Sequence, residues 1–158
     1  MLKIGDKMPE FELMNQDGEM VSSKNLLKSK KKHLIYFYPK DDTPGCTTEA
    51  CGFRDLRYEL QDKGVEIIGI SKDSVKSHKT FADKFKLNFT LLSDDLTETI
   101  QKFGAWGEKN FMGHKSIGTL RISYLFDEQG KVEKVYGKVV TKEHPSEVLE
   151  DVENAILR

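Results

Sequence analysis

The sequence predicts an α/β fold in which a central mixed sheet is flanked by helices. Three features favour it: a hairpin pattern in residues 11–21, alternating strand and helix patterns in residues 34–103, and a second hairpin followed by a helix in residues 120–157. Strands that alternate with helices indicate a mainly parallel sheet with helices on both faces, and the closing hairpin makes the sheet mixed. Residues 1–158 are expected to form a single domain.

Each expected element rests on apolar periodicity and on residues that favour turns or helix ends. Asp17-Gly18 is typical of a hairpin turn, with the hairpin strands at 11–14 and 19–21. Thr43 can N-cap a helix that has Pro44 in its first turn and ends at Gly64. The remaining expected elements are strands at 34–38, 65–71 and 89–92, helices at 75–85 and 96–103, a loop at 105–116, a hairpin of strands 120–126 and 132–136, and a final helix opened by Pro145 with Val148, Leu149, Val152, Ile156 and Leu157 on its apolar side.

Charge and hydropathy patterns exclude several classes of partner. A formal net charge of -1 argues against a surface that neutralises phosphates, so no nucleic-acid partner is expected. The basic block of Lys28, Lys30, Lys31 and Lys32 is expected to be a solvated loop. No apolar run approaches membrane-spanning length, and residues 1–6 contain no hydrophobic signal region. We therefore expect a cytoplasmic protein with no membrane partner.

Cys46 lies where the strand at 34–38 is followed by a long helix. Backbone N–H groups in the first turn of a helix are unpaired and favour negative charge. A thiol in that position ionises more easily than an ordinary one, and the thiolate is the reactive form of cysteine. Sites in sheets of this kind lie beyond the carboxyl ends of the strands. The sequence therefore indicates a functional site at Cys46.

Cys51, the second of the two cysteines, follows five residues later. On one regular helix the two side chains would point ~140° apart with Cα atoms about 8.5 Å apart, whereas a disulfide needs less than about 7 Å. A permanent disulfide is therefore not expected, and bridging would require at least one turn to unwind. Two other interpretations are buried thiols that act as small hydrophobic residues and a metal site. The second lacks support, because the four histidines show no spacing typical of zinc: His33, His78, His114 and His144.

The pattern Pro39-x-x-x-Thr43-x-x-Cys46 resembles the active-site motif of peroxiredoxins. The longer run from Phe37 to Cys51 resembles the bacterioferritin comigratory protein, or peroxiredoxin Q, subgroup. The resemblance covers nearly the whole chain and includes Gly5-Asp6-x-x-Pro9-x-Phe11, Gly69-Ile70-Ser71-x-Asp73-Ser74, Trp106-Gly107-Glu108-Lys109 and Gly118-x-x-Arg121. One departure is the stretch from Ile122 to Phe126, where many members have Ser-Thr-Phe-Leu-Ile, and this affects the expected shape of the pocket.

The resemblance implies a thioredoxin-like fold and the reduction of hydrogen peroxide and organic hydroperoxides without a cofactor or metal. Cys46 matches the peroxidatic cysteine, whose thiolate attacks the peroxide and becomes a sulfenic acid. Cys51 matches the resolving cysteine, which forms an intramolecular disulfide with it. A thioredoxin or glutaredoxin-type donor would then reduce the disulfide. The subgroup is commonly monomeric, so a monomer or a weak dimer is expected.

Four further residues match roles in the family's site. Thr43 matches the residue whose hydroxyl holds the peroxide, and Arg121 matches the arginine that favours the thiolate. Pro39 matches the proline that shields the pocket from water. Glu49 resembles a glutamate that orients an arginine, and it helps only if Arg121 or another arginine neutralises it.

Other interpretations stay open at this point. Trp106 and the Phe111-Met112 pair could cover the site or simply pack in the core or in a loop. A thioredoxin-like disulfide oxidoreductase is a rival function, although its cysteines are usually two residues apart and a proline faces its site, which Gly118-Thr119-Leu120 does not supply. A redox sensor or holdase that binds a partner once oxidised is a rival from a non-enzymatic class.

Overall fold

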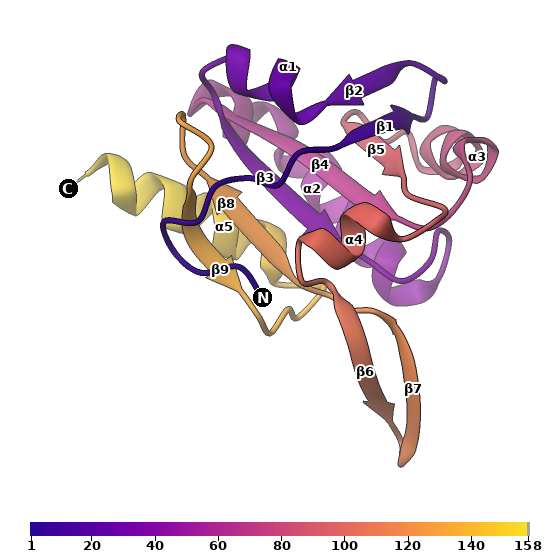
Figure 1. Cartoon of the computed structure of the whole chain (residues 1–158). Coiled ribbons are helices and arrows are strands. Elements are labelled where there is room, and N and C mark those ends of the chain that lie inside the picture. The colour runs from indigo at the N-terminus through magenta and orange to yellow at the C-terminus, as the bar shows by residue number, and fades with distance from the viewer. Residues whose placement is uncertain (158) are drawn as a thin grey trace.

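In the computed structural model, which describes residues 1–157, seven strands form one mixed sheet in the order β2-β1-β5-β4-β3-β8-β9 (Figure 1). The strands of this sheet are β1 (Glu12–Asn15), β2 (Met20–Ser22), β3 (Lys32–Phe37), β4 (Val65–Ser71), β5 (Thr90–Ser93), β8 (Ser123–Phe126) and β9 (Val132–Tyr136). The helices are α1 (Ser23–Lys28), α2 (Pro44–Asp62), α3 (Val75–Phe85), α4 (Glu98–Lys102) and α5 (His144–Ile156). The predicted α/β class, with a mixed sheet flanked by helices and an N-terminal hairpin, is confirmed.

The sheet contains more antiparallel pairing than the mainly parallel arrangement that the sequence predicts. Strands β3, β4 and β5 run parallel to one another, as predicted for strands connected by helices. Strand β1 pairs antiparallel with β5, and β8 pairs antiparallel with β3. The sheet is therefore parallel at its centre and antiparallel towards both edges, because a hairpin is added on each side.

Two apolar cores lie on opposite faces of the sheet. Side chains alternate along β3, so Leu34 and Tyr36 enter one core while Ile35 and Phe37 enter the other. Helices α2, α3 and α5 cover the first face, and α4 with the N-terminal segment covers the second. The prediction of helices on both faces is thus confirmed, and strand β3 is buried between the two layers.

Helix α2 begins at Pro44, as the Thr43-Pro44 pattern predicts, and ends just before Gly64, whose φ of +77° suits a helix end. Thr43 occupies the N-cap position, but its side chain makes no capping hydrogen bond. Its Oγ1 instead donates to the carbonyl oxygen of Lys40 at 2.8 Å. The expected capping bond is wrong because this hydroxyl closes the preceding turn.

Residues 105–116 were expected to form a loop, and this prediction is wrong. They belong to a separate hairpin of β6 (Trp106–Phe111) and β7 (His114–Thr119), which projects from the body of the molecule (Figure 1). Its turn residues Met112 and Gly113 both have positive φ, 51° and 83°, which suits a two-residue hairpin turn. Most side chains on both faces of this ribbon are exposed or half-buried, so the sequence shows no alternation of apolar and polar residues.

Smaller differences concern the basic block and the last helix. Lys28 ends helix α1, which the sequence did not predict, and Lys32 begins β3, so the block is not simply a solvated loop. Lys32 pairs with Glu133 at 2.9 Å. Ile156 and Leu157 are largely exposed, because the end of the chain runs past the edge of the core. Within the described part of the chain, no helix is both long enough and apolar enough to cross a membrane.

Candidate active site

The antiparallel pairing of β3 with β8 brings Cys46 and Arg121 to the same edge of the sheet. Cys46 follows the carboxyl end of β3 and lies in the first turn of α2, where it is buried. Strand β8 runs antiparallel to β3, with Ser123 opposite Tyr36. The residues just before β8 therefore meet the residues just after β3, and Arg121 is one of them.

Arg121 contacts two acidic groups of α2 at once. Its Nη2 lies 3.3 Å from Sγ of Cys46, and its Nη1 donates to Oε1 of Glu49 at 2.9 Å. Glu49 lies one turn beyond Cys46 on the same helix and is fully buried. At Gly45, a Cβ atom would lie 3.3 Å from Nη2 of Arg121, so the missing side chain leaves room for the guanidinium.

Burial and neighbouring charges shift the pKa values of Glu49 and Arg121 in opposite directions. Burial raises the pKa of Glu49 to about 7, although the charge and the hydrogen bond of Arg121 lower it. Burial lowers the pKa of Arg121, but the negative charges of Cys46 and Glu49 outweigh this and the net shift is upward. Among residues 1–157, Oε2 of Glu49 has no hydrogen-bond partner. One guanidinium therefore serves two acids, since its two terminal nitrogens contact Glu49 and Cys46 separately.

Cys51 lies further along the same continuous helix and is half-buried. Both cysteines are free thiols. Because α2 is unbroken from Pro44 to Asp62, the helical estimate of about 8.5 Å between the two Cα atoms applies, which exceeds the reach of a disulfide. The structure therefore has the two cysteines in an arrangement that cannot close without a change in α2.

Thr43 and Pro39 belong to the loop that connects β3 to α2. Both residues are half-buried. The hydrogen bond from Thr43 to the carbonyl oxygen of Lys40 fixes the last turn of this loop before Cys46. The structure thus places the predicted residues in three groups: Cys46, Glu49 and Arg121 in direct contact, Thr43 and Pro39 in the adjoining loop, and Cys51 apart on α2.

Two residues near the site were not singled out from the sequence. Tyr36 is fully buried, and burial followed by the Glu49 and Cys46 charges raises its pKa far above the ordinary value. Its hydroxyl has no partner within the described residues. Lys109 of β6 is the second, since burial and then Arg121 lower its pKa while Cys46 raises it. The sequence does not distinguish Tyr36 from an ordinary core tyrosine, and it predicts a loop at Lys109.

Trp106, Phe111 and Met112 of the β6–β7 hairpin, which could cover the site, differ in their burial. Trp106 packs against the core that contains Ile100 and Phe103, which agrees with the packing interpretation. Phe111 and Met112 lie at the hairpin tip and are 75% and 83% exposed. They contribute nothing to the burial of Cys46.

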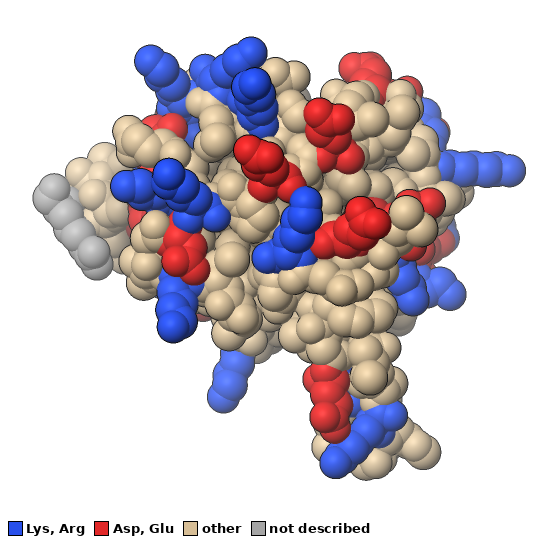
Figure 2. Space-filling model, in the orientation of Figure 1, with Lys and Arg blue, Asp and Glu red and all other residues tan. Residues whose placement is uncertain are grey.

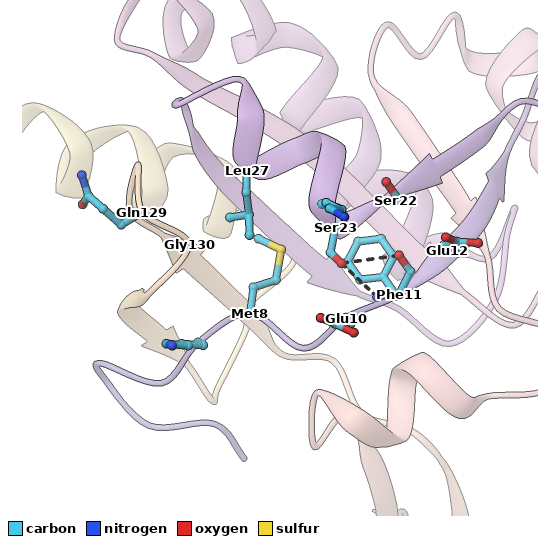
Figure 3. A pocket seen from close by; sticks show the side chains of 11 residues that line it. Met8, Glu10, Phe11, Glu12, Ser22, Ser23, Leu27, Gln129 and Gly130 are labelled. Carbon is cyan, nitrogen blue, oxygen red and sulfur yellow. Dashed lines mark hydrogen bonds between the residues drawn. The ribbon is translucent and has the colours of Figure 1, made fainter.

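A cavity of about 580 Å³ lies at the other end of the sheet (Figure 3). Met8 and Leu27 point toward one another in it, and Gly130 from the turn after β8 lies beside them. His33 at the amino end of β3 pairs with Phe126 at the end of β8, which locates this turn away from Cys46. No sequence-predicted site residue lines the cavity, so the thiol site and the cavity are separate features.

Basic and acidic side chains are interspersed on the face of the molecule that Figure 2 shows. Some of the basic block is already paired, since Lys31 and Arg57 both contact the carboxylate of Glu66. Part of the positive charge on this surface is therefore balanced by neighbouring carboxylates.

Comparisons with known proteins agree with the geometry. A sequence profile of the AhpC/TSA family matches residues 4–135. The putative peroxiredoxin Bcp of Coxiella burnetii is 47% identical over 148 residues, which cover 94% of this chain and 97% of that protein. The peroxiredoxin Bcp of Escherichia coli is also 47% identical over 148 residues, with 94% of each chain covered.

Solved structures give the same result. The bacterioferritin comigratory protein of Xanthomonas campestris superposes with a TM-score of 0.84 at 34% identity, covering 92% of this chain and 91% of that one. Peroxidoxin BcpB of Mycobacterium tuberculosis superposes with a TM-score of 0.85 at 31% identity, covering 98% of both chains. These likenesses support a thiol-dependent peroxidase activity. The chain therefore belongs to the AhpC/TSA family and, within it, to the peroxiredoxins of the bacterioferritin comigratory protein and peroxiredoxin Q type.

Proposed function

We propose that the protein is a thioredoxin-dependent peroxidase in which Cys46 is the peroxidatic cysteine and Cys51 resolves it. The observation that carries the proposal is the contact of 3.3 Å between Nη2 of Arg121 and Sγ of Cys46. The thiol also lies in the first turn of α2, where unpaired N–H groups favour an anion. A guanidinium and a helix N-terminus together stabilise a thiolate more than either does alone.

The chemical step is a displacement on oxygen. The Cys46 thiolate attacks one peroxide oxygen, an S–O bond forms, and the O–O bond breaks. The leaving oxygen takes a proton and departs as water or an alcohol, and Cys46 becomes a sulfenic acid. Negative charge grows on the leaving oxygen during this step, and fixed donors aimed at it lower the barrier. Arg121 is one such donor. The Thr43 hydroxyl, whose hydrogen is donated to the Lys40 carbonyl oxygen, is proposed to accept a hydrogen bond from the peroxide, with Pro39 limiting water.

The second step joins the two cysteines. The Cys51 thiol attacks the sulfenic sulfur of Cys46, an S–S bond forms, and water leaves. Because the folded helix holds the two residues too far apart, α2 must first unwind by at least a turn. A thioredoxin or glutaredoxin-type dithiol then reduces the disulfide by exchange and is itself oxidised.

Organic hydroperoxides are proposed as substrates beside hydrogen peroxide. The Xanthomonas campestris relative, 34% identical to this chain, is described as having alkyl peroxide reduction activity. Thr43 and Pro39 are half-buried in the loop before Cys46, and their methyl and ring atoms are proposed to contact the alkyl group.

A peroxide-consumption assay with thioredoxin, thioredoxin reductase and NADPH tests the proposal. The wild-type protein should turn over, Cys46→Ser should not react, and Cys51→Ser should reduce one equivalent and then stop as a sulfenic acid that dimedone labels. Full thioredoxin-dependent turnover by Cys51→Ser would contradict its resolving role. A stoichiometric disulfide without turnover in the wild-type protein would favour a redox sensor instead.

A further inference from the structure

A buried pair of charged residues lies beside the proposed site, formed by Asp41 of the loop and His78 of α3. Nδ1 of His78 lies 2.7 Å from Oδ2 of Asp41. Its Nε2 lies 2.9 Å from the carbonyl oxygen of Leu92. The His78 side chain is fully buried and that of Asp41 is 4% exposed. Nothing in the chemistry proposed for Cys46 uses either group.

Three side chains form hydrogen bonds with the Asp41 carboxylate. Oδ1 accepts from the Tyr38 hydroxyl at 2.6 Å, and Oδ2 accepts from the Ser77 hydroxyl at 2.8 Å in addition to His78. The carbonyl oxygen of Leu92 can only accept, so Nε2 of His78 donates to it, and Nδ1 is engaged with the Asp41 carboxyl group. Asp73 also lies near this pair, but both ring nitrogens are engaged in hydrogen bonds within the protein, and we treat the group as a hydrogen-bond network.

A buried ion pair is weak as a source of stability, because removing two charges from water costs about as much as their attraction returns. The contact instead holds Asp41 of the loop at a fixed position relative to α3. The pair connects α3 to the loop only five residues before Cys46.

The same loop is held on the α3 side at two further points. The backbone N–H of Asp41 donates to Oδ2 of Asp73 at 3.0 Å, and Oδ2 of Asp42 pairs with Nζ of Lys84 at 2.7 Å. Asp42 has a positive φ of 55°, a conformation that is uncommon for a residue other than glycine and needs support from its surroundings. These contacts involve α3 and the turn before it rather than the first turns of α2, so the loop is held independently of α2.

We propose that Asp41 and His78 are positioning residues that fix the loop from Pro39 to Thr43, and with it the Thr43 hydroxyl and the Cys46 thiol, for attack on the peroxide. The inference rests on the proposed function for its activity readout. A displacement of about 1 Å at a reacting group can cost on the order of 100-fold in rate. The pair stays in place when α2 unwinds, so the loop returns to the same geometry after each cycle.

Three variants separate positioning from charge and from general stability. His78→Leu removes both donors and leaves the carboxylate without its cation. Asp41→Asn removes the charge but can rebuild every bond, since its amide nitrogen donates to Nδ1 of a neutral His78 and to Ser77 while its oxygen accepts from Tyr38. Lys79→Ala is the matched control, because it removes half-exposed ion pairs of the same helix, with Asp17 and Asp83, that do not involve the loop.

The readout is the ratio of two rate constants for Cys46, one for hydrogen peroxide and one for iodoacetamide. Alkylation reports an accessible, ionised thiol but needs no aligned peroxide. We expect the ratio to fall about 10-fold or more in His78→Leu and to stay near the wild-type value in Asp41→Asn and Lys79→Ala. An unchanged ratio in a folded His78→Leu protein with a lowered melting temperature overturns the proposal, since the pair is then only structural. A fall in Asp41→Asn as large as in His78→Leu also overturns it, in favour of an electrostatic role.

Two further measurements apply if His78→Leu does not fold or if the wild-type protein consumes no peroxide. If His78→Leu fails to fold, Ser77→Ala removes one donor to Asp41 and should lower the ratio in the same direction, and no change there overturns the proposal. If the wild-type protein consumes no peroxide, the proposed function fails, and amide exchange of residues 40–42 decides on the pair. Lost protection there in His78→Leu or Ser77→Ala supports the pair as the anchor of the loop, and unchanged protection refutes it.

Discussion

Nη2 of Arg121 lies 3.3 Å from Sγ of Cys46, although the two residues are 75 positions apart in the chain. The contact exists because β8 pairs antiparallel with β3, so that the residue entering one strand meets the helix that follows the other. It gives Cys46 a permanent cation that does not depend on pH, since a guanidinium stays charged in proteins.

Removing this cation should slow the reaction with peroxide. We expect Arg121→Gln to lower the second-order rate constant by about 10² to 10³, the usual effect of losing one donor to the charge of the transition state. Arg121→Lys should give an intermediate rate, because an ammonium keeps the charge but cannot contact Cys46 and Glu49 with a planar fork. Stopped-flow measurement of a single turnover gives these rates. Arg57→Gln, which breaks a pair with Glu66 elsewhere on α2, is the control and should react as the wild type does.

Glu49 should make stability depend on pH. Its pKa is about 7 in the folded protein, above the ordinary value of 4.5, so the folded state holds this proton more tightly than the unfolded state. The free energy of unfolding should therefore fall as pH rises from about 4.5 to 7, by up to about 3 kcal/mol from this group. Glu49→Gln should lack this loss, so its stability relative to the wild type should increase from pH 5 to pH 8 in urea titrations.

The exposed Glu59 on the same helix offers a matched control for this effect. Glu59→Gln should follow the wild-type pH dependence. A constant difference between Glu49→Gln and the wild type across the pH range would contradict the assignment of a raised pKa to Glu49.

Oxidation should unwind only the start of α2. Amides of residues 47–52 should lose protection from hydrogen exchange in the disulfide form, since the bridge requires at least one turn to open. Amides from Arg57 onward should stay protected, because their acceptor carbonyls begin at Phe53, which is fully buried and holds the rest of the helix in the core. Mass spectrometry of exchanged peptides from both redox states makes this comparison, and equal exchange in residues 47–52 would count against the unwinding step.

A second helix limits how far α2 can move. At Gly52 a Cβ atom would lie 2.7 Å from Cγ of Pro145 in α5, closer than two carbon atoms can approach. Gly52→Ala should therefore lower stability, because overpacking costs typically 1–3 kcal/mol and exceeds the gain of about 1 kcal/mol from better helix propensity. Thermal unfolding measures this change. Gly107→Ala, where the new Cβ would meet Leu120 at 3.5 Å, should be close to neutral in steric terms, and a Gly52→Ala protein as stable as the wild type would refute the contact.

Two elements with strong apolar periodicity were predicted from the sequence with accurate bounds, whereas the strand predicted at 120–126 begins only at Ser123. Strand β4 and helix α3 match the predicted ranges, because runs such as Ile67 to Ile70 are buried and helix positions such as Phe81 face the core. The hairpin β6–β7 was missed for the opposite reason, since its side chains are mostly exposed and its strands pair only with each other. The pattern of apolar residues predicts an element where one of its faces is buried, and it gives no signal where most side chains are exposed.

The sequence by itself determined that Cys46 follows a buried strand in the first turn of a helix, and that Cys51 on the same helix is too distant to bridge. These statements depend on local backbone geometry, which the order of residues specifies within a few positions. Only the tertiary structure decided which cation meets Cys46, that Glu49 shares it, and that His78 holds Asp41 beside the site. Those contacts join residues far apart in the chain, and they depend on the pairing of strands and the packing of helices rather than on any local pattern.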